Sequence, residues 1–308
     1  MTNAYLQRWL SLGSVLLWWL LAWHWASSHP WLAVGCFLAP ALITPTLIAI
    51  QCIVSCIVSR ESAVPRARVG GWLQAWWRET RIAWQIFSWW QPFFRAALAD
   101  QLHRPASASA DQRGVVLVHG FFCNRAFWTL WMRRLRREGR VFVAVDLEPA
   151  FGSIDAYVQT IECAVRQVSD ATGQPPVVVG HSMGGLAIRA WLRSVGGLQR
   201  VHQVITIGTP HHGTALARYG HGTNGAQMRQ RSRWLEALGQ VENATHTVLE
   251  RNKFVCFYSN CDNIVFPVSS AMLQGADNRL VVHRGHVDLA FAPVVQAACW
   301  DAMGASES

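Results

Sequence analysis

The chain has 308 residues, of which 51% are hydrophobic and 15% are charged, and its formal net charge is +9. This composition excludes an intrinsically disordered polypeptide, which combines low hydrophobicity with high charge. The length leaves room for one enzyme-sized domain and a smaller segment. Charge is distributed unevenly, because residues 1–59 contain one Arg and no Lys, Asp or Glu. Residues 1–59 are therefore expected to lie in a solvent other than water.

Two uncharged apolar stretches in residues 1–59 are candidates for membrane spans. The first, residues 9–25, would extend ~26 Å as a helix, close to the ~30 Å thickness of a hydrocarbon layer. The second, residues 31–58, is longer and contains Pro40 and Pro45. We therefore predict two transmembrane helices that form a hairpin. A cleaved signal peptide is the weaker alternative, because a second apolar stretch follows the first.

The positions of arginine predict the orientation of this hairpin. Arg8 precedes the first stretch and residues 60–68 carry three further Arg, whereas the turn between the stretches has no Arg or Lys. Basic residues accumulate on the cytoplasmic side of membrane spans. Both ends of the hairpin, and with them the rest of the chain, are therefore expected in the cytoplasm, with membrane lipid as a partner.

Residues 60–112 are predicted to form an amphipathic juxtamembrane helix and a linker. Five apolar residues recur at helical spacing, namely Trp72, Trp76, Ala83, Ile86 and Trp90. Arg78, Glu79 and Arg81 fall outside this apolar stripe. The pattern fits a helix in the membrane interface and equally a helix packed on a globular domain. Residues 103–112, with Pro105 and alternating Ala and Ser, predict the linker.

From residue 113 onward, short apolar runs rich in β-branched residues alternate with helical patterns. The six runs are residues 115–118, 141–145, 177–179, 204–207, 254–258 and 280–282. Their continuous apolar character indicates strands buried on both faces, as in parallel sheets covered by helices. We predict an α/β domain over residues 113–308 with a doubly wound, mostly parallel sheet. In proteins with such sheets, the catalytic and ligand-binding residues lie beyond the carboxyl ends of the strands.

A catalytic triad is predicted at three of these strand ends. Gly180-His181-Ser182-Met183-Gly184 matches G-x-S-x-G between a strand and a helix, where a sharp turn lifts the serine above the sheet. A nucleophilic serine needs a base that an acid orients. Asp262 follows the fifth run and His286 follows the sixth, in the chain order of the α/β-hydrolase fold. The alternative is a turn-forming Asp and a surface His.

Two backbone amides are predicted to form an oxyanion hole. The amide of Met183 follows the nucleophile, and the amide of Phe121 belongs to the loop after the first strand, where Gly120 allows the backbone to bend. Neither a metal nor a cofactor is expected, because the neighbouring His211 and His212 have no carboxylate or Cys nearby in the sequence. Nucleic acid is not an expected partner, because the Arg-rich residues 133–140 fit the solvated face of a helix.

These segments together resemble bacterial triacylglycerol lipases and esterases of the α/β-hydrolase superfamily. The resemblance covers residues 113–303 and rests on four motifs in order: residues 116–121, 180–185, 207–214, and the segments around Asp262 and His286. It implies hydrolysis of acyl esters through an acyl-enzyme, without a cofactor. It also implies that residues 208–213 line the substrate cleft. With the predicted hairpin, the expected location is the bacterial inner membrane.

Three questions stay open at this level. The same triad could transfer its acyl group to an alcohol or thiol, which would make the protein an acyltransferase. A membrane-anchored interaction protein without catalysis is the other alternative. Residues 226–239, within the longer segment 214–250, fit either a mobile cover over an acyl pocket or a fixed surface segment.

Overall fold

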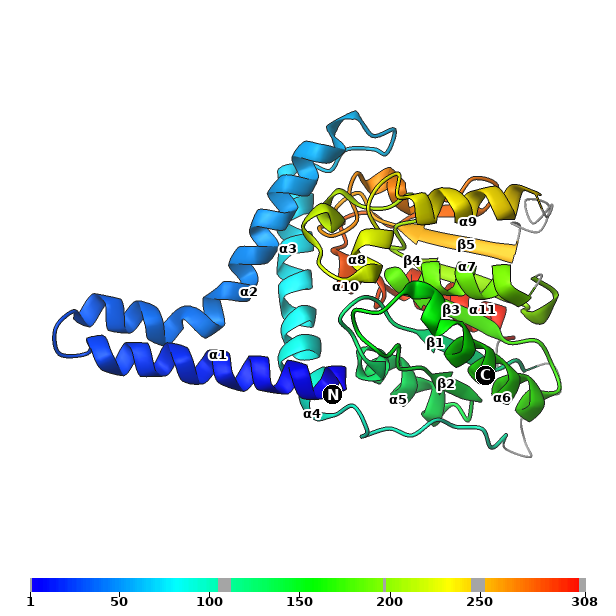
Figure 1. Ribbon diagram of the computed structural model, residues 1–308, viewed down its shortest axis with the longest axis horizontal. Helices are drawn as coiled ribbons and strands as arrows, with labels where there is room; N and C mark the ends of the chain where they lie inside the picture. The colour runs from blue at the N-terminus through cyan, green and yellow to red at the C-terminus, as the bar shows by residue number, and fades with distance from the viewer. Residues whose placement is uncertain (1, 105–111, 196–197, 245–252, 305–308) are drawn as a thin grey trace.

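The computed structural model describes residues 2–104, 112–195, 198–244 and 253–304. Helices come first: α1 (Asn3–Trp25), α2 (Pro30–Val58), α3 (Val69–Ala83), a π-helical segment (Trp84–Trp90) and α4 (Gln91–Phe93). A sheet domain follows (Figure 1). The predicted domain boundaries at residues 59 and 112 stay predictions, and residues 105–111 of the predicted linker lie outside the described residues.

The sheet has six parallel strands in the order β2-β1-β3-β4-β5-β6. The strands are β1 (Val115–Val118), β2 (Phe142–Ala144), β3 (Val177–His181), β4 (Gln203–Ile207), β5 (Phe254–Tyr258) and β6 (Asp277–Leu280). This confirms the predicted parallel α/β sheet. The sixth strand was predicted too late in the chain, because it ends at Leu280 and is an edge strand with partly exposed residues.

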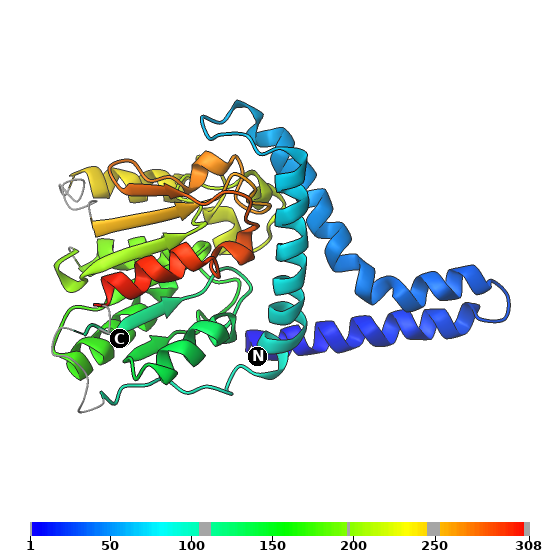
Figure 2. The ribbon, with the colours of Figure 1, turned by 180° about the vertical axis from the view of Figure 1, so that it is seen from behind.

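Helices cover both faces of the sheet, which makes it doubly wound (Figures 1 and 2). They are α5 (Thr129–Arg137), α6 (Val158–Thr172), α7 (Met183–Val195), α8 (Thr223–Gln227), α9 (Arg233–Ala244), α10 (His286–Leu289) and α11 (Pro293–Ala302). The core on one face contains residues of α6 and α7, and the core on the other contains residues of α5 and α11. Burial on both faces explains why β1, β5 and the first three residues of β3 are apolar without alternation.

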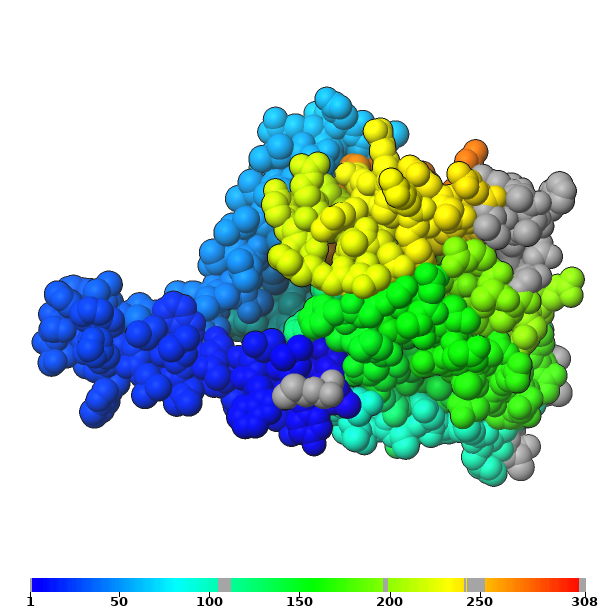
Figure 3. Space-filling model, in the orientation of Figure 1, coloured from blue at the N-terminus to red at the C-terminus, as the bar shows by residue number. Residues whose placement is uncertain are grey.

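Helix α1 and the first part of α2 run antiparallel and extend away from the sheet domain as a hairpin, whereas α2 then bends and its second part runs beside α3 (Figure 1). The hairpin projects from the rest of the molecule in Figure 3. Trp19 stacks on Phe37 across the hairpin, with ring centroids 6.1 Å apart. By length and composition, one helix among the described residues, Pro30–Glu61, could cross a membrane. In the second half of α2, Ile48, Cys52 and Ser55 are buried, whereas Ile50, Ile53 and Ile57 are exposed.

Helix α3 lies between α2 and the sheet domain (Figure 2). Its Ala75 and Glu79, with Ile86 and Trp90 of the following π-helical segment, are buried. One side of the helix therefore packs on the globular domain, which is one of the two alternatives that the sequence left open. Trp77, Trp84 and Trp89 remain exposed.

Residues 226–239, for which the sequence left a mobile cover and a fixed segment open, pack against the sheet domain. Met228 and Leu235 belong to a core cluster of the domain, and Leu238 is also buried. The α9 residue Glu242 forms an ion pair with Arg189 of α7, at 2.8 Å. These contacts favour a fixed segment, while residues 245–252 lie outside the described residues.

Candidate active site

Ser182 occupies the sharp turn between β3 and α7. Its φ of 56° lies in the left-handed region that residues other than glycine rarely adopt, as expected for a nucleophile elbow. Its amide donates a hydrogen bond to the carbonyl of Ile207 at the end of β4, at 2.9 Å. A methyl group on Gly184 would lie 2.5 Å from the carbonyl oxygen of Val118. Glycine there allows α7 to begin directly against the end of β1.

Asp262 and His286 form a buried hydrogen-bonded pair. Nδ1 of His286 lies 2.9 Å from Oδ2 and 3.1 Å from Oδ1 of Asp262. The same carboxylate accepts hydrogen bonds from the amides of Ile264 and Val265, at 2.9 and 2.8 Å. The backbone thus orients the acid, which in turn orients the imidazole so that Nε2 is left to act as a base.

The environment of His286 favours its protonated form. Burial acts to lower the pKa of His286, but the Asp262 carboxylate and, more weakly, Glu79 outweigh burial, so that the pKa is raised. A raised pKa suits a base that must take up a proton during the reaction.

Ser182 lies at the same edge of the sheet as this pair. The side chain of the preceding His181 donates from Nε2 to the carbonyl of His286, at 3.0 Å. Gly208, which follows the Ile207 bonded to Ser182, is close to both partners: a methyl group there would lie 3.1 Å from Nδ1 of His286 and 3.2 Å from Oδ2 of Asp262. Among the described residues no hydrogen bond joins Ser182 Oγ to His286, and such bonds are often long before substrate binds.

A buried histidine, His119, holds the loop after β1 to the segment after β2. The amide of Leu147 donates to Nε2 of His119 at 3.0 Å, so Nδ1 carries the proton and donates to the carbonyl of Gly120 at 2.9 Å. Burial lowers the pKa of His119, which keeps it in this neutral form. The described residues provide no hydrogen-bond acceptor for the amides of Phe121 and Met183, as an oxyanion hole requires.

The residue that sequence reasoning missed is Glu79 of α3. It was expected outside the apolar stripe, but its side chain is buried. Its carboxylate accepts hydrogen bonds from the amide of Val287, at 3.0 Å, and from the amide of Asp288, at 2.8 Å. These two amides directly follow His286. A single charged residue beside an apolar stripe gave no signal of this contact.

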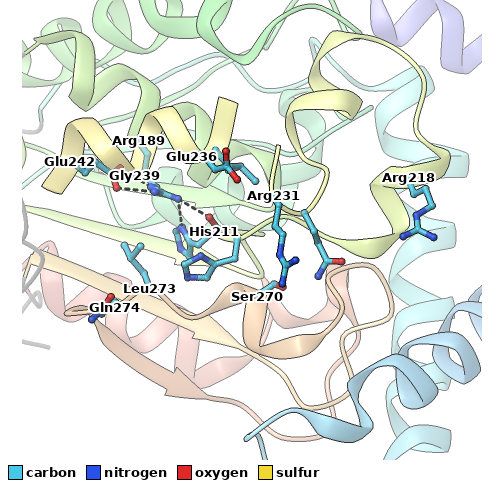
Figure 4. Close-up of a pocket in the computed structure, with 13 residues that line it drawn as sticks. Arg189, His211, Arg218, Arg231, Glu236, Gly239, Glu242, Ser270, Leu273 and Gln274 are labelled. Carbon is cyan, nitrogen blue, oxygen red and sulfur yellow. Dashed lines mark hydrogen bonds and ion pairs between the residues drawn. The ribbon is translucent and has the colours of Figure 1, made fainter. Parts of the chain in front are cut away.

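His211 and His212 both face a groove beside α9. His211 is buried, with Nε2 3.1 Å from Thr206 Oγ1, and its carbonyl accepts a hydrogen bond from Arg189. Both histidines line a polar groove of about 700 Å³ beside α9 (Figure 4). Residues 208–213, which the resemblance implies line the substrate cleft, therefore face two places. Gly208 lies next to the Asp262–His286 pair, whereas His211 and His212 face the groove beside α9.

Comparison with known proteins identifies related sequences. Residues 115–251 match the model of the family described as "Alpha/beta hydrolase family". A triacylglycerol lipase of Burkholderia plantarii is 32% identical over 153 residues, which cover 45% of this chain and 41% of that relative. The chain therefore matches less than half the length of this curated relative.

Solved structures share the fold. The mature form of a Bacillus licheniformis lipase superimposes with a TM-score of 0.54 at 18% identity, covering 63% of this chain and 95% of that one. The propeptide form of the same lipase gives a TM-score of 0.51 at 18% identity, covering 60% and 49% of the two chains. In neither case does the overlap extend over all of this chain.

Gly120 offers a test of the site's geometry. A methyl group there would lie 2.8 Å from Cβ of Ser182 and 3.2 Å from the carbonyl of His181. The substitution Gly120→Ala should displace the Phe121 amide and slow labelling of Ser182 by a fluorophosphonate about ten- to a hundredfold. Gly239→Ala is the matched control, because nothing lies within 4 Å of its added methyl group. Equal labelling rates in the two variants would contradict the predicted geometry.

Proposed function

We propose that this chain is an α/β-hydrolase that cleaves carboxylic esters with lipid-like acyl groups. The observation that carries the proposal is the buried pair of Asp262 and His286 at the sheet edge where Ser182 sits on its elbow. A serine on a sharp turn and an imidazole oriented by a carboxylate are the groups that acyl transfer requires. The similarity to a triacylglycerol lipase supports an ester as the substrate.

The proposed reaction proceeds through an acyl-enzyme. Ser182 Oγ attacks the ester carbonyl while Nε2 of His286 takes the hydroxyl proton, and Asp262 holds the resulting imidazolium. The amides of Phe121 and Met183 stabilise the oxyanion. The C–O bond to the alcohol then breaks, and His286 returns the proton to the departing alcohol. Water attacks the acyl-enzyme by the same relay, which releases the acid and restores Ser182.

An aromatic cluster beside the proposed oxyanion hole supports an apolar acyl group. Phe121 and Phe122 both pack against Phe151, with ring centroids 5.7 and 5.8 Å apart. A mainly apolar pocket of about 370 Å³ adjoins Phe151 and is lined also by Leu6 of α1 and Pro149. Apolar walls of this kind bind hydrocarbon in preference to charged groups.

We also propose that the hairpin anchors the protein in a membrane, with the sheet domain in the cytoplasm. Large apolar side chains are exposed along both helices, among them Trp9, Leu16, Trp23, Trp31 and Phe37. Water would leave this surface unpartnered, whereas lipid would cover it. The basic residues that flank the hairpin favour the cytoplasmic orientation. An anchored site of this kind would take its substrate from the bilayer.

Ser182→Ala tests the reaction. The variant should retain its fold and lose hydrolysis of short p-nitrophenyl esters by about 10³-fold or more, because no other group supplies the nucleophile. Initial rates and circular dichroism of the purified full-length chain measure the two effects. Wild-type turnover in the folded variant would refute the assignment of Ser182.

A fusion test addresses the orientation. Alkaline phosphatase is active only in the periplasm, where its disulfides form. A fusion after Ser308 should therefore be inactive, and the corresponding fusion of green fluorescent protein should be fluorescent. An active phosphatase fusion would overturn the cytoplasmic orientation while leaving the proposed chemistry intact.

A further inference from the structure

We propose that helices α1–α3 position the loops of the catalytic site, and that Glu79 of α3 is the positioning residue for His286. The inference rests on the proposed function, because it concerns the same triad. It adds that the N-terminal helices are needed for catalysis as well as for anchoring. Each of the three helices makes polar contacts with a different loop of the site.

Helix α3 holds the backbone that carries His286. The Glu79 carboxylate accepts the amides of Val287 and Asp288 at the start of α10, at 3.0 and 2.8 Å. Little room is left around it, because a methyl group on Gly285 would lie 2.5 Å from Oε2 of Glu79. The carboxylate therefore anchors the backbone directly after His286 and lies close to Gly285 directly before it. Displacement of α3 would move the imidazole with it.

Helix α2 holds the loop that carries Asp262. Ser55 Oγ donates to the carbonyl of Asp262 at 2.5 Å. Gln51 Oε1 accepts from Nδ2 of Asn263 at 2.8 Å, and Oδ1 of the same Asn263 accepts from the amide of His286 at 3.0 Å. A chain of hydrogen bonds thus runs from α2 through Asn263 to the histidine.

Helix α1 holds the loop of the proposed oxyanion hole. Gln7 Nε2 donates to the carbonyl of Phe122 at 2.6 Å, and Asn3 Nδ2 donates to the carbonyl of Cys123 at 2.7 Å. Oε1 of Gln7 accepts from Asn124 of the same loop at 2.9 Å. Both helical residues are buried. The loop that supplies the Phe121 amide is therefore fixed from the outside by α1.

Glu79 acts on His286 through charge as well as through the backbone. Burial raises the pKa of Glu79 to about 7, against the effect of its two amide partners, which favour the carboxylate. A charged Glu79 raises the pKa of His286. The other titratable or charged groups around Glu79 and His286 are Asp262, His181 beside the His286 ring, Asp288 with its partner Arg284, Arg78 of α3 and Cys52 of α2. Removal of the Glu79 charge should therefore lower the pKa of His286.

The substitution Glu79→Gln tests this coupling in the purified full-length chain in detergent micelles. We expect kcat to fall about ten- to a hundredfold with little change in KM, since the imidazole is displaced. The acidic limb of the pH profile should move to lower pH, because a base with a lower pKa is deprotonated at lower pH. NMR of histidine-labelled protein should show the same lowered pKa for His286.

Two further variants separate charge, position and folding. Glu79→Asp keeps the charge but withdraws the carboxylate, so kcat should fall while the acidic limb stays in place. Glu61→Gln makes the same chemical change at an exposed carboxylate of the segment between α2 and α3, and should leave both quantities unchanged. If Glu79→Gln fails to fold, Glu79→Asp alone decides, and wild-type kcat in it would overturn the proposal.

The NMR titration separates this proposal from the proposed function. Ester hydrolysis that survives in Ser182→Ala would end the assigned reaction, but the Glu79 effect on the pKa of His286 could still be measured. An unmoved His286 titration and an unmoved acidic limb in folded Glu79→Gln would make Glu79 a purely structural helix cap and overturn the proposal.

Two matched serines, Ser55 of α2 and Ser59 directly after this helix, test the second contact. Ser55→Ala removes the hydrogen bond to Asp262 and should lower kcat about tenfold without a change in the pH profile. Ser59 lies one turn later, and its Oγ accepts from the amide of Val268, away from the triad residues. Ser59→Ala should therefore keep kcat within about twofold of the wild type. Equal losses in both variants would show general docking of α2 and overturn its positioning role.

Discussion

The buried hydrogen bond between Asp262 and His286 is the interaction on which the arrangement of the site depends. Both side chains are almost fully removed from water, so each would be strongly destabilised without its partner. The pair comes from two loops after different strands, and it persists only if both loops are held in place. Their backbone amides and carbonyls are accordingly bonded to Glu79, Ser55 and neighbouring groups.

The sheet alone does not supply that constraint. Parallel register aligns the carboxyl ends of β3, β4 and β5, and this alignment places Ser182 beside Gly208 and the loop of Asp262. Strand β6 is different, because it is short, lies at the edge and ends at Leu280, well before His286. The backbone around His286 therefore needs support from outside the sheet, and α3 provides it through Glu79.

Ser182 and Asp262 could be predicted from local sequence, because they closely follow the buried strands β3 and β5. The glycines around Ser182 form a local motif that occurs at the turn between a strand and a helix. Asp262 and His286 were then found from the chain order in which the acid and the base follow that serine. Glu79 and Val287 are 208 positions apart in the chain, and neither segment has a sequence feature that predicts their contact. The sixth strand was misplaced because an exposed edge strand such as Asp277–Leu280 lacks the continuous apolar run of a central strand.

Polar residues inside the apolar helices carry more information than their small number suggests. Gln7, Gln51 and Ser55 lie near the ends of the two stretches, where an unpaired polar side chain facing lipid would be costly. Each of them instead bonds to a loop of the sheet domain. The helices are thus divided along their length: one part exposes mainly apolar and aromatic groups, and the other joins the domain. A helix pair that only anchored the protein would have no need of the second part, so these residues connect the position of the hairpin to the geometry of the site.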